Sequence, residues 1–172
     1  KLINYETTAG TASNTYNGVR YSFPLVRMSD LYLLYAEALN EANSTPVADV
    51  YAYTDKVRER AGLKGVVESW KKSKLANKPN TQEGMREIIH QERLNELACE
   101  GVRSADLRRW KEAMDYLNQP VRGWNYQGET ADSYYTVVTY ANRIFKTKDY
   151  LWPIKTNSIT INSNLVQNPG WE

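Results

Sequence analysis

The most informative stretch of the sequence is MREIIHQERLNELACEGVRSADLRRW, from Met85 to Trp110. At 3.6 residues per turn, one helical face collects apolar side chains, namely Met85, Ile88, Ile89 and Cys99. Glu92 and Glu96 fall in the middle of this same face. Because a buried carboxylate must find cations or become neutral, the face requires positive partners.

Four arginines in the same stretch can supply these partners: Arg93, Arg103, Arg108 and Arg109. We therefore predict a structural ion-pair network of these arginines with Glu92 and Glu96. The helix is expected over residues 81–100, with Thr81 as its N-cap and Gly101 as its stop. A second helix over 104–118 would then carry Leu107 and Trp110 on its apolar stripe.

Two more helices are predicted before this stretch, over 28–43 and 46–61. The first is expected to bury a stripe of residues at helical spacing: Leu31, Leu34, Tyr35, Ala38, Leu39 and Ala42. The second would bury Val47, Val50, Tyr51, Thr54 and Val57, and end at Gly62. The short connection at 43–46 makes the two helices antiparallel neighbours.

The predicted fold class is mainly α, with tetratricopeptide-like antiparallel helical hairpins and an irregular C-terminal wrap. Residues 1–22 are expected to form an irregular N-terminal segment, and residues 23–118 the helical hairpin scaffold, with a linker at 64–80. Residues 119–172 are expected to be irregular and to pack on the helices, with one short strand in YYTVVTY at 134–140. All three parts are interpreted as one domain.

Composition excludes several classes of protein. A 41% hydrophobic and 24% charged chain with net charge +2 is typical of a globular protein. The one basic run, KKSK at 71–74, is interpreted as a solvated loop and not as a nucleic-acid surface. No apolar run has transmembrane length, and Cys99, the single cysteine, is expected to be a small buried hydrophobe.

Catalytic chemistry finds little support. Glu92 and Glu96 are spaced i, i+4, which resembles the carboxylate separation of retaining glycosidases. However, such enzymes place the pair across a cleft, whereas these two share an inward face with arginines. His90 is the only histidine, and no metal-ligand spacing or phosphate loop accompanies it. We predict no catalytic residue, no metal and no cofactor.

The aromatic residues are the remaining candidates for function. The chain has 13 Tyr and 5 Trp but only 2 Phe, and Tyr and Trp are favoured at half-wet interfaces. Trp124 and Tyr126, beside polar neighbours, are candidate ligand-binding residues that could stack on the C–H face of a sugar. The alternative is that they anchor a loop. Trp110 and Trp152 are interpreted as core residues.

Five segments resemble, in order, the C-terminal region of the SusD/RagB family. They are RMSDLYLLYAEALNEAN at 27–43, VRERAGL at 57–63, the ER pair Glu92–Arg93 with NELACEGVR at 95–103, ADLRRW at 105–110 and YLWPIKTNSITINSNLVQNPGW at 150–171. Family members are much longer and begin with a lipidated cysteine, which this chain lacks. We therefore expect the chain to be part of a longer parent protein.

The resemblance implies a nutrient-binding lipoprotein of the outer membrane in the Bacteroidetes group, displayed at the cell surface. Such proteins serve starch or other polysaccharide utilisation: they bind a glycan or oligosaccharide, or in some members a peptide, and pass it to a partner TonB-dependent transporter. Neither catalysis nor nucleic-acid binding is implied. The alternative is a helical protein-interaction scaffold that contacts the transporter or the rest of its own chain without binding sugar. No family ligand residue can be assigned to a position here.

Overall fold

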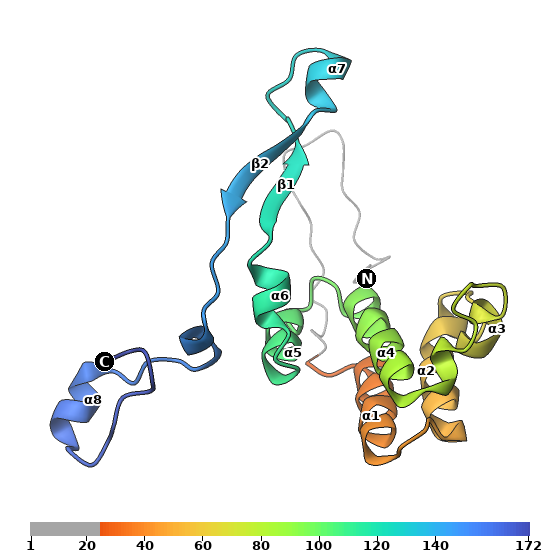
Figure 1. Ribbon diagram of the computed structural model, residues 1–172, viewed down its shortest axis with the longest axis horizontal. Coiled ribbons are helices and arrows are strands. Elements are labelled where there is room, and N and C mark those ends of the chain that lie inside the picture. The colour runs from red at the N-terminus through yellow and green to blue at the C-terminus, as the bar shows by residue number, and fades with distance from the viewer. Residues whose placement is uncertain (1–24) are drawn as a thin grey trace, which may run out of the picture. The chain divides into compact units, whose positions relative to one another are not determined.

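The structure is a computed structural model that describes residues 25–172, so the predicted N-terminal segment 1–22 lies outside the described residues. The described residues form two compact units, one ending at Glu96 and one running from Leu97 to Glu172. Within them the chain is mainly helical, with eight α-helices, two short 3-10 helices and one two-stranded sheet (Figure 1). The unit boundary falls inside the predicted 23–118 scaffold.

In the first unit, helices α1 (Met28–Ala42) and α2 (Ala48–Arg60) form the predicted antiparallel pair (Figure 1). Helix α4 (Gln82–Glu96) packs against α1. The core of the unit consists of Ala36, Val50, Val66, Met85, Ile88 and Ile89, all of which are buried. The predicted inner face of the first three turns of α4 is therefore confirmed, and so is that of α2 for Val50, Thr54 and Val57. Val47, just before α2, is 37% exposed, so its predicted burial is wrong.

The predicted buried face of α1 is wrong except at Leu39, which is partly buried and packs against the core. Leu31, Leu34 and Tyr35 are 46%, 38% and 45% exposed, while the buried side carries Ser29, Leu33, Ala36, Glu37 and Asn40. This side is polar because it binds α4 through hydrogen bonds: the Asn40 side-chain amide donates to the Gln82 carbonyl at 2.9 Å, and the Gln82 amide donates to the Asn40 carbonyl at 3.1 Å. A hydrophobic stripe cannot reveal such a face.

Helix α2 ends as predicted at Gly62, whose φ of +74° is the left-handed conformation that glycine favours. The Leu63 N–H donates to the Arg58 carbonyl and the Gly62 N–H to the Glu59 carbonyl, which is the Schellman pattern. The following linker is more ordered than predicted, because it contains α3 (Val66–Trp70) and the 3-10 helix η1 (Lys78–Asn80).

Helix α4 begins as predicted, because the Thr81 hydroxyl accepts a hydrogen bond from the Gly84 N–H at 3.1 Å. It ends at Glu96, four residues before the predicted end. The backbone turns left-handed at Cys99 (φ 66°) and again at Gly101 (φ 80°). Cys99 is consequently exposed, and the expectation of a small buried hydrophobe is wrong.

The second unit starts with α5 (Arg103–Arg109) and α6 (Ala113–Leu117), so the helix predicted over 104–118 is interrupted. The break lies at Lys111, which has a φ of 60°. Its N–H donates to the Arg108 carbonyl and the Glu112 N–H donates to the Leu107 carbonyl, the same pattern that ends α2. Since a lysine occupies the position usually taken by glycine, no residue type marks the end of a helix here.

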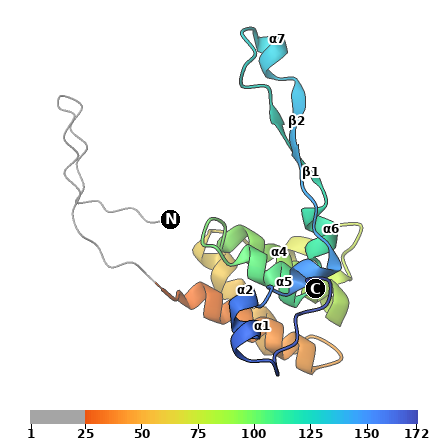
Figure 2. The same cartoon turned by 90° about the vertical axis from the view of Figure 1, so that its left-hand side faces the viewer.

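The C-terminal part of the second unit holds a β-hairpin where one strand was predicted. Strand β1 (Pro120–Trp124) pairs antiparallel with β2 (Val137–Asn142), and α7 (Ala131–Tyr134) lies at the far end of the hairpin (Figure 2). The 3-10 helix η2 (Thr147–Tyr150) and α8 (Thr156–Ile161) follow. Phe145 and Tyr150 pack with Leu107, Ala113 and Leu117, so this segment does pack on the helices of its own unit.

Candidate functional site

An exposed cluster of five aromatic side chains lies on the β1–β2 hairpin and α7. Its members are Trp124, Tyr126, Tyr134, Tyr135 and Tyr140, with exposed fractions of 39–69%. The Trp124 ring meets the Tyr135 ring edge-to-face at 5.0 Å, and the Tyr126 and Tyr140 rings stack at 5.5 Å with 20° between their planes. The two predicted ligand-binding residues thus belong to two ring groups on the same hairpin, Trp124 with Tyr134 and Tyr135, and Tyr126 with Tyr140.

A β-bulge positions Tyr140 within this cluster. The ladder pairs Val121 with Ala141 and Arg122 with Thr139, which leaves Tyr140 as the extra residue on β2. Its ring lies over Gly123, where a Cβ would be 3.3 Å from the ring edge. Its hydroxyl donates to the Trp124 carbonyl at 2.6 Å and accepts from the Tyr126 N–H at 3.3 Å. These contacts fix the backbone between the two candidate residues.

Helix α7 is fixed on the hairpin by a capping box and by close backbone packing. The Thr130 hydroxyl accepts from the Ser133 N–H at 3.3 Å, and the Ser133 hydroxyl accepts from the Thr130 N–H at 3.0 Å. Gly128 lies against the α7 backbone so closely that a Cβ there would collide with the Tyr134 nitrogen. The tyrosines of α7 are therefore held beside Trp124.

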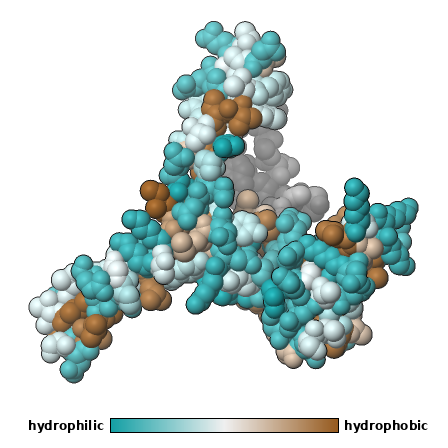
Figure 3. Space-filling model, in the orientation of Figure 1, coloured by the Kyte–Doolittle hydropathy of each residue, from teal (hydrophilic) through white to brown (hydrophobic). Residues whose placement is uncertain are grey.

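The cluster presents ring surfaces to solvent among polar groups. Trp124 and Tyr126 are 56% and 69% exposed, and hydrophobic side chains gather on the hairpin close to α7 (Figure 3). Exposed rings on a backbone that hydrogen bonds hold in place offer apolar faces on which a ligand can stack.

Glu92 and Glu96 both form ion pairs in the first unit, but with arginines that the sequence analysis missed. Arg58 Nη1 pairs with Glu92 Oε1, and the Glu96 Oε1 atom pairs with Arg27 Nη2 at 2.8 Å and Arg60 Nη2 at 2.5 Å. Burial alone would raise the pKa of Glu96, but hydrogen bonds from Arg27, Arg60 and Ser29 outweigh it and lower the pKa below 4.5. Two carboxylates held in this way are structural.

The four arginines predicted to pair with Glu92 and Glu96 contact other residues. Arg93 Nη1 pairs with Asp30 at 2.9 Å, and its Nε lies 4.0 Å from Glu37. In the second unit Arg109 pairs with Asp106 at 3.0 Å, and the Arg103 guanidinium lies over the Tyr116 ring at 4.8 Å. Arg108 lies between the rings of Phe145 and Trp152. The partners of Glu92 and Glu96 come from α2 and from the residue before α1, so spacing along one helix could not reveal them.

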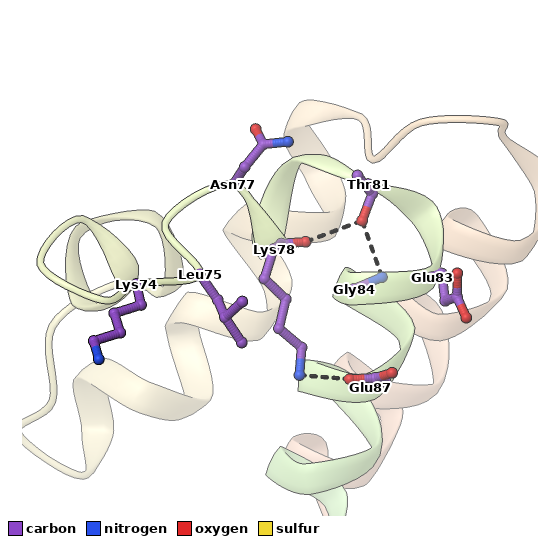
Figure 4. Close-up of a pocket in the computed structure, with 8 residues that line it drawn as sticks. All are labelled: Lys74, Leu75, Asn77, Lys78, Thr81, Glu83, Gly84 and Glu87. Atoms are coloured by element: carbon purple, nitrogen blue, oxygen red, sulfur yellow. Dashed lines mark hydrogen bonds and ion pairs between the residues drawn. The ribbon is translucent and has the colours of Figure 1, made fainter.

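The described surface has two pockets of about 400 Å³ each, one in each unit. The first lies where η1 meets the start of α4, and Lys78 and Glu87 form a 2.5 Å ion pair across it (Figure 4). The second, in the C-terminal unit, is lined by Arg108, Trp152 and Trp171 among others. Within residues 25–172, no group of three or more His, Cys, Asp or Glu side chains could hold a metal ion. Over that same range, no helix is long and apolar enough to cross a membrane.

The tryptophan expectations divide. Trp152 is expected in the core because its neighbours are apolar, but it is 79% exposed. Leu151 and Pro153 are exposed too, so an apolar neighbourhood in the sequence does not mark burial here. Trp110 is half-buried, with the Arg109 guanidinium 4.8 Å from its ring centroid. Tyr134, Tyr135 and Tyr140 joined the aromatic cluster without being singled out. Their signal was the YYTVVTY run, which was interpreted only as a strand.

Comparison with known proteins gives consistent matches. A model of the SusD family matches residues 1–171. SusD-like protein P2 of Formosa agariphila is 32% identical over 176 aligned positions, which cover 99% of this chain and 30% of P2. SusD-like protein P25 of the same bacterium is 40% identical over 91 residues, covering 53% of this chain and 16% of P25.

Solved structures agree with the sequence relatives. The crystal structure of a SusD-like protein from Bacteroides fragilis superimposes with a TM-score of 0.66 and 29% identity, over 83% of this chain and 24% of that one. The chain therefore spans less than a third of the length of each of these relatives. SusD proteins as a family are non-catalytic binding proteins. The family match over nearly every residue is decisive: this chain belongs to the SusD family.

Proposed function

We propose that this chain is part of a protein that binds glycans at the bacterial cell surface. The observation that carries the proposal is the SusD family match over residues 1–171, since the family's general role is glycan binding at the outer membrane. The exposed aromatic cluster on the β1–β2 hairpin supports it locally. Trp124 and Tyr126 would provide the stacking surface for a sugar ring.

The proposed parent is a lipid-anchored outer-membrane protein that delivers its ligand to a partner TonB-dependent transporter. In this arrangement the antiparallel pair α1–α2 acts as a tetratricopeptide-like hairpin of a helical scaffold. The ion pairs of Glu92 and Glu96 support this scaffold role, because they join α4 to α2 and to the start of α1. Binding would leave the glycan chemically unchanged.

A second candidate function is supported by the exposed side of α1. Leu31, Leu34 and Tyr35 form an apolar stripe there, with the small residue Ala38 continuing it. Such a stripe fits a helical scaffold region that contacts the transporter or the rest of its own parent chain. In that case this chain would not bind sugar itself.

Affinity gel electrophoresis distinguishes the two candidates. This chain and its longer parent are run through native gels that contain soluble neutral or acidic polysaccharides, with bovine serum albumin as the unretarded standard. Retardation of both proteins supports a sugar site within these residues. Retardation of the parent alone supports the scaffold role, and migration of both at the rate of the standard on every glycan contradicts the glycan-binding proposal.

A further inference from the structure

The second pocket of the C-terminal unit combines ring surfaces with one guanidinium. Its volume is about 400 Å³, within the range of roughly 300–1,000 Å³ usual for small-ligand sites. Arg108, Phe145, Asp149, Trp152, Pro153 and Trp171 line it. Most of this lining is aromatic or apolar, and Trp152 offers the largest exposed ring, at 79%.

Arg108 has hydrogen-bonding capacity left for a ligand. Its guanidinium lies 5.5 Å from the Phe145 ring centroid and 5.7 Å from that of Trp152. Its Nε donates to the Asp149 carbonyl at 3.5 Å and its Nη1 to the Ser104 carbonyl at 3.3 Å. No carboxylate of the described residues pairs with it, and its Nη2 donates to none of them. The fork geometry of a guanidinium suits a bidentate carboxylate.

The charge around the pocket favours an anion. The only acidic lining residue is Asp149, and its Oδ2 already accepts the Lys146 N–H at 2.7 Å. Lys148 adds a second positive charge, since its Nζ lies 4.1 Å from the Trp171 ring centroid. Within the lining itself, Arg108 is thus the one cation, and the one carboxylate is already engaged.

The walls of the pocket are fixed before any ligand binds. The Trp171 indole N–H donates to the carbonyls of Lys148 and Leu151 at 3.0 and 3.2 Å. The Trp152 carbonyl accepts a 2.6 Å hydrogen bond from the Asn168 amide. A ring-shaped anion could therefore place its carboxylate on Arg108 beside the fixed Trp171 ring and its apolar face on the exposed Trp152 ring.

We propose that this pocket binds a uronic acid residue of an acidic glycan. The inference rests on the proposed glycan-binding function and deepens it by naming the class of sugar. The Arg108 guanidinium holds the carboxylate, and the Trp152 ring stacks on the C–H face of the sugar.

The test measures binding of this chain to polygalacturonate and to neutral pullulan by affinity electrophoresis. Arg108→Gln is expected to weaken binding to polygalacturonate by about tenfold or more, because a charge-assisted hydrogen bond is lost. Trp152→Ala should weaken it similarly, and since that side chain is mostly exposed, the variant is expected to fold. Lys155→Gln, which removes an exposed positive charge from the same segment without lining the pocket, is the matched control and should stay within about twofold.

Each result decides between the two proposals. Tighter binding to polygalacturonate than to pullulan, with losses in Arg108→Gln and Trp152→Ala but not in Lys155→Gln, supports the uronate pocket. Binding to pullulan alone, or equal binding of polygalacturonate by Arg108→Gln, Trp152→Ala and the unaltered chain, overturns the pocket and leaves glycan binding standing. Binding to neither of these two overturns the pocket, and absence of retardation on every polysaccharide of the gel panel overturns glycan binding as well. A salt titration adds a second readout: the unaltered chain should lose affinity with salt more steeply than Arg108→Gln.

Discussion

Replacing Glu92 with Gln should destabilise the first unit substantially. The residue is 9% exposed, and the side chain of its partner Arg58 is 12% exposed. Removing one member of a buried ion pair costs about 3–5 kcal/mol, because the other charge loses its partner. Arg58 keeps hydrogen bonds to the Lys64 carbonyl at 2.8 Å and to the Ser69 hydroxyl at 2.9 Å. Since these retain part of the stabilisation, we expect a loss of about 2–3 kcal/mol.

Urea unfolding followed by far-UV circular dichroism measures this loss, because the long helices α1, α2 and α4 all lie in the first unit. Glu87→Gln is the matched control on the same helix. Glu87 also pairs with a lysine, Lys78, but its side chain is 59% exposed, so the cost should stay below about 1 kcal/mol. Equal effects of the two substitutions, or a Glu92→Gln variant as stable as the unaltered chain, would refute the assignment of a buried structural pair.

Three further changes test other parts of the structure. The pKa of Glu96 lies below the usual value of a glutamate, because its hydrogen bonds outweigh its burial. The ion pairs of Glu96 therefore stabilise the fold fully above the usual glutamate pKa, and this stabilisation is lost as the pH falls through the lowered pKa. The free energy of unfolding of Glu96→Gln should consequently depend less on pH in the acid range. Ile89→Ala, at a fully buried core position, should cost about 2–5 kcal/mol in the same urea assay, whereas Leu94→Ala at a 37% exposed position should cost far less. Gly128→Ala would drive a methyl group into the α7 backbone and displace Tyr134 from Trp124, so the near-UV circular dichroism of the cluster should weaken; an unchanged spectrum would contradict that packing.

Apolar periodicity predicted the parts of the fold in which burial follows hydrophobicity. Met85, Ile88 and Ile89 lie in the core, and so do Val50 and Val57 on the facing side of α2. The type of a single residue was equally informative at the ends of helices. Thr81 caps α4 and Gly62 ends α2 because a hydroxyl acceptor and a left-handed glycine serve those positions best.

Prediction failed where contacts distant in sequence determine the structure. The buried side of α1 carries Glu37 and Asn40, because Arg93 and the Gln82 carbonyl on α4 bind the Glu37 carboxylate and the Asn40 side-chain N–H. No pattern within α1 could reveal those partners. The left-handed turn at Lys111 could not be predicted, because no glycine occupies that position. The aromatic cluster depends on the register of β1 and β2 and on the bulge at Tyr140, so only Trp124 and Tyr126 could be named from local composition.

We propose that this chain binds a glycan through the exposed aromatic residues of its β1–β2 hairpin. The most direct test of this claim is a calorimetric titration of the chain with the soluble glycan that retards it most in the gel, repeated with Trp124→Ala and Tyr126→Ala. Tyr116→Ala, at a half-exposed tyrosine on α6, is the control. We expect either hairpin variant to lose about tenfold or more in affinity, because the ring surface that stacks on the sugar is removed, while the control binds normally. Unchanged affinity in both hairpin variants would contradict the claim.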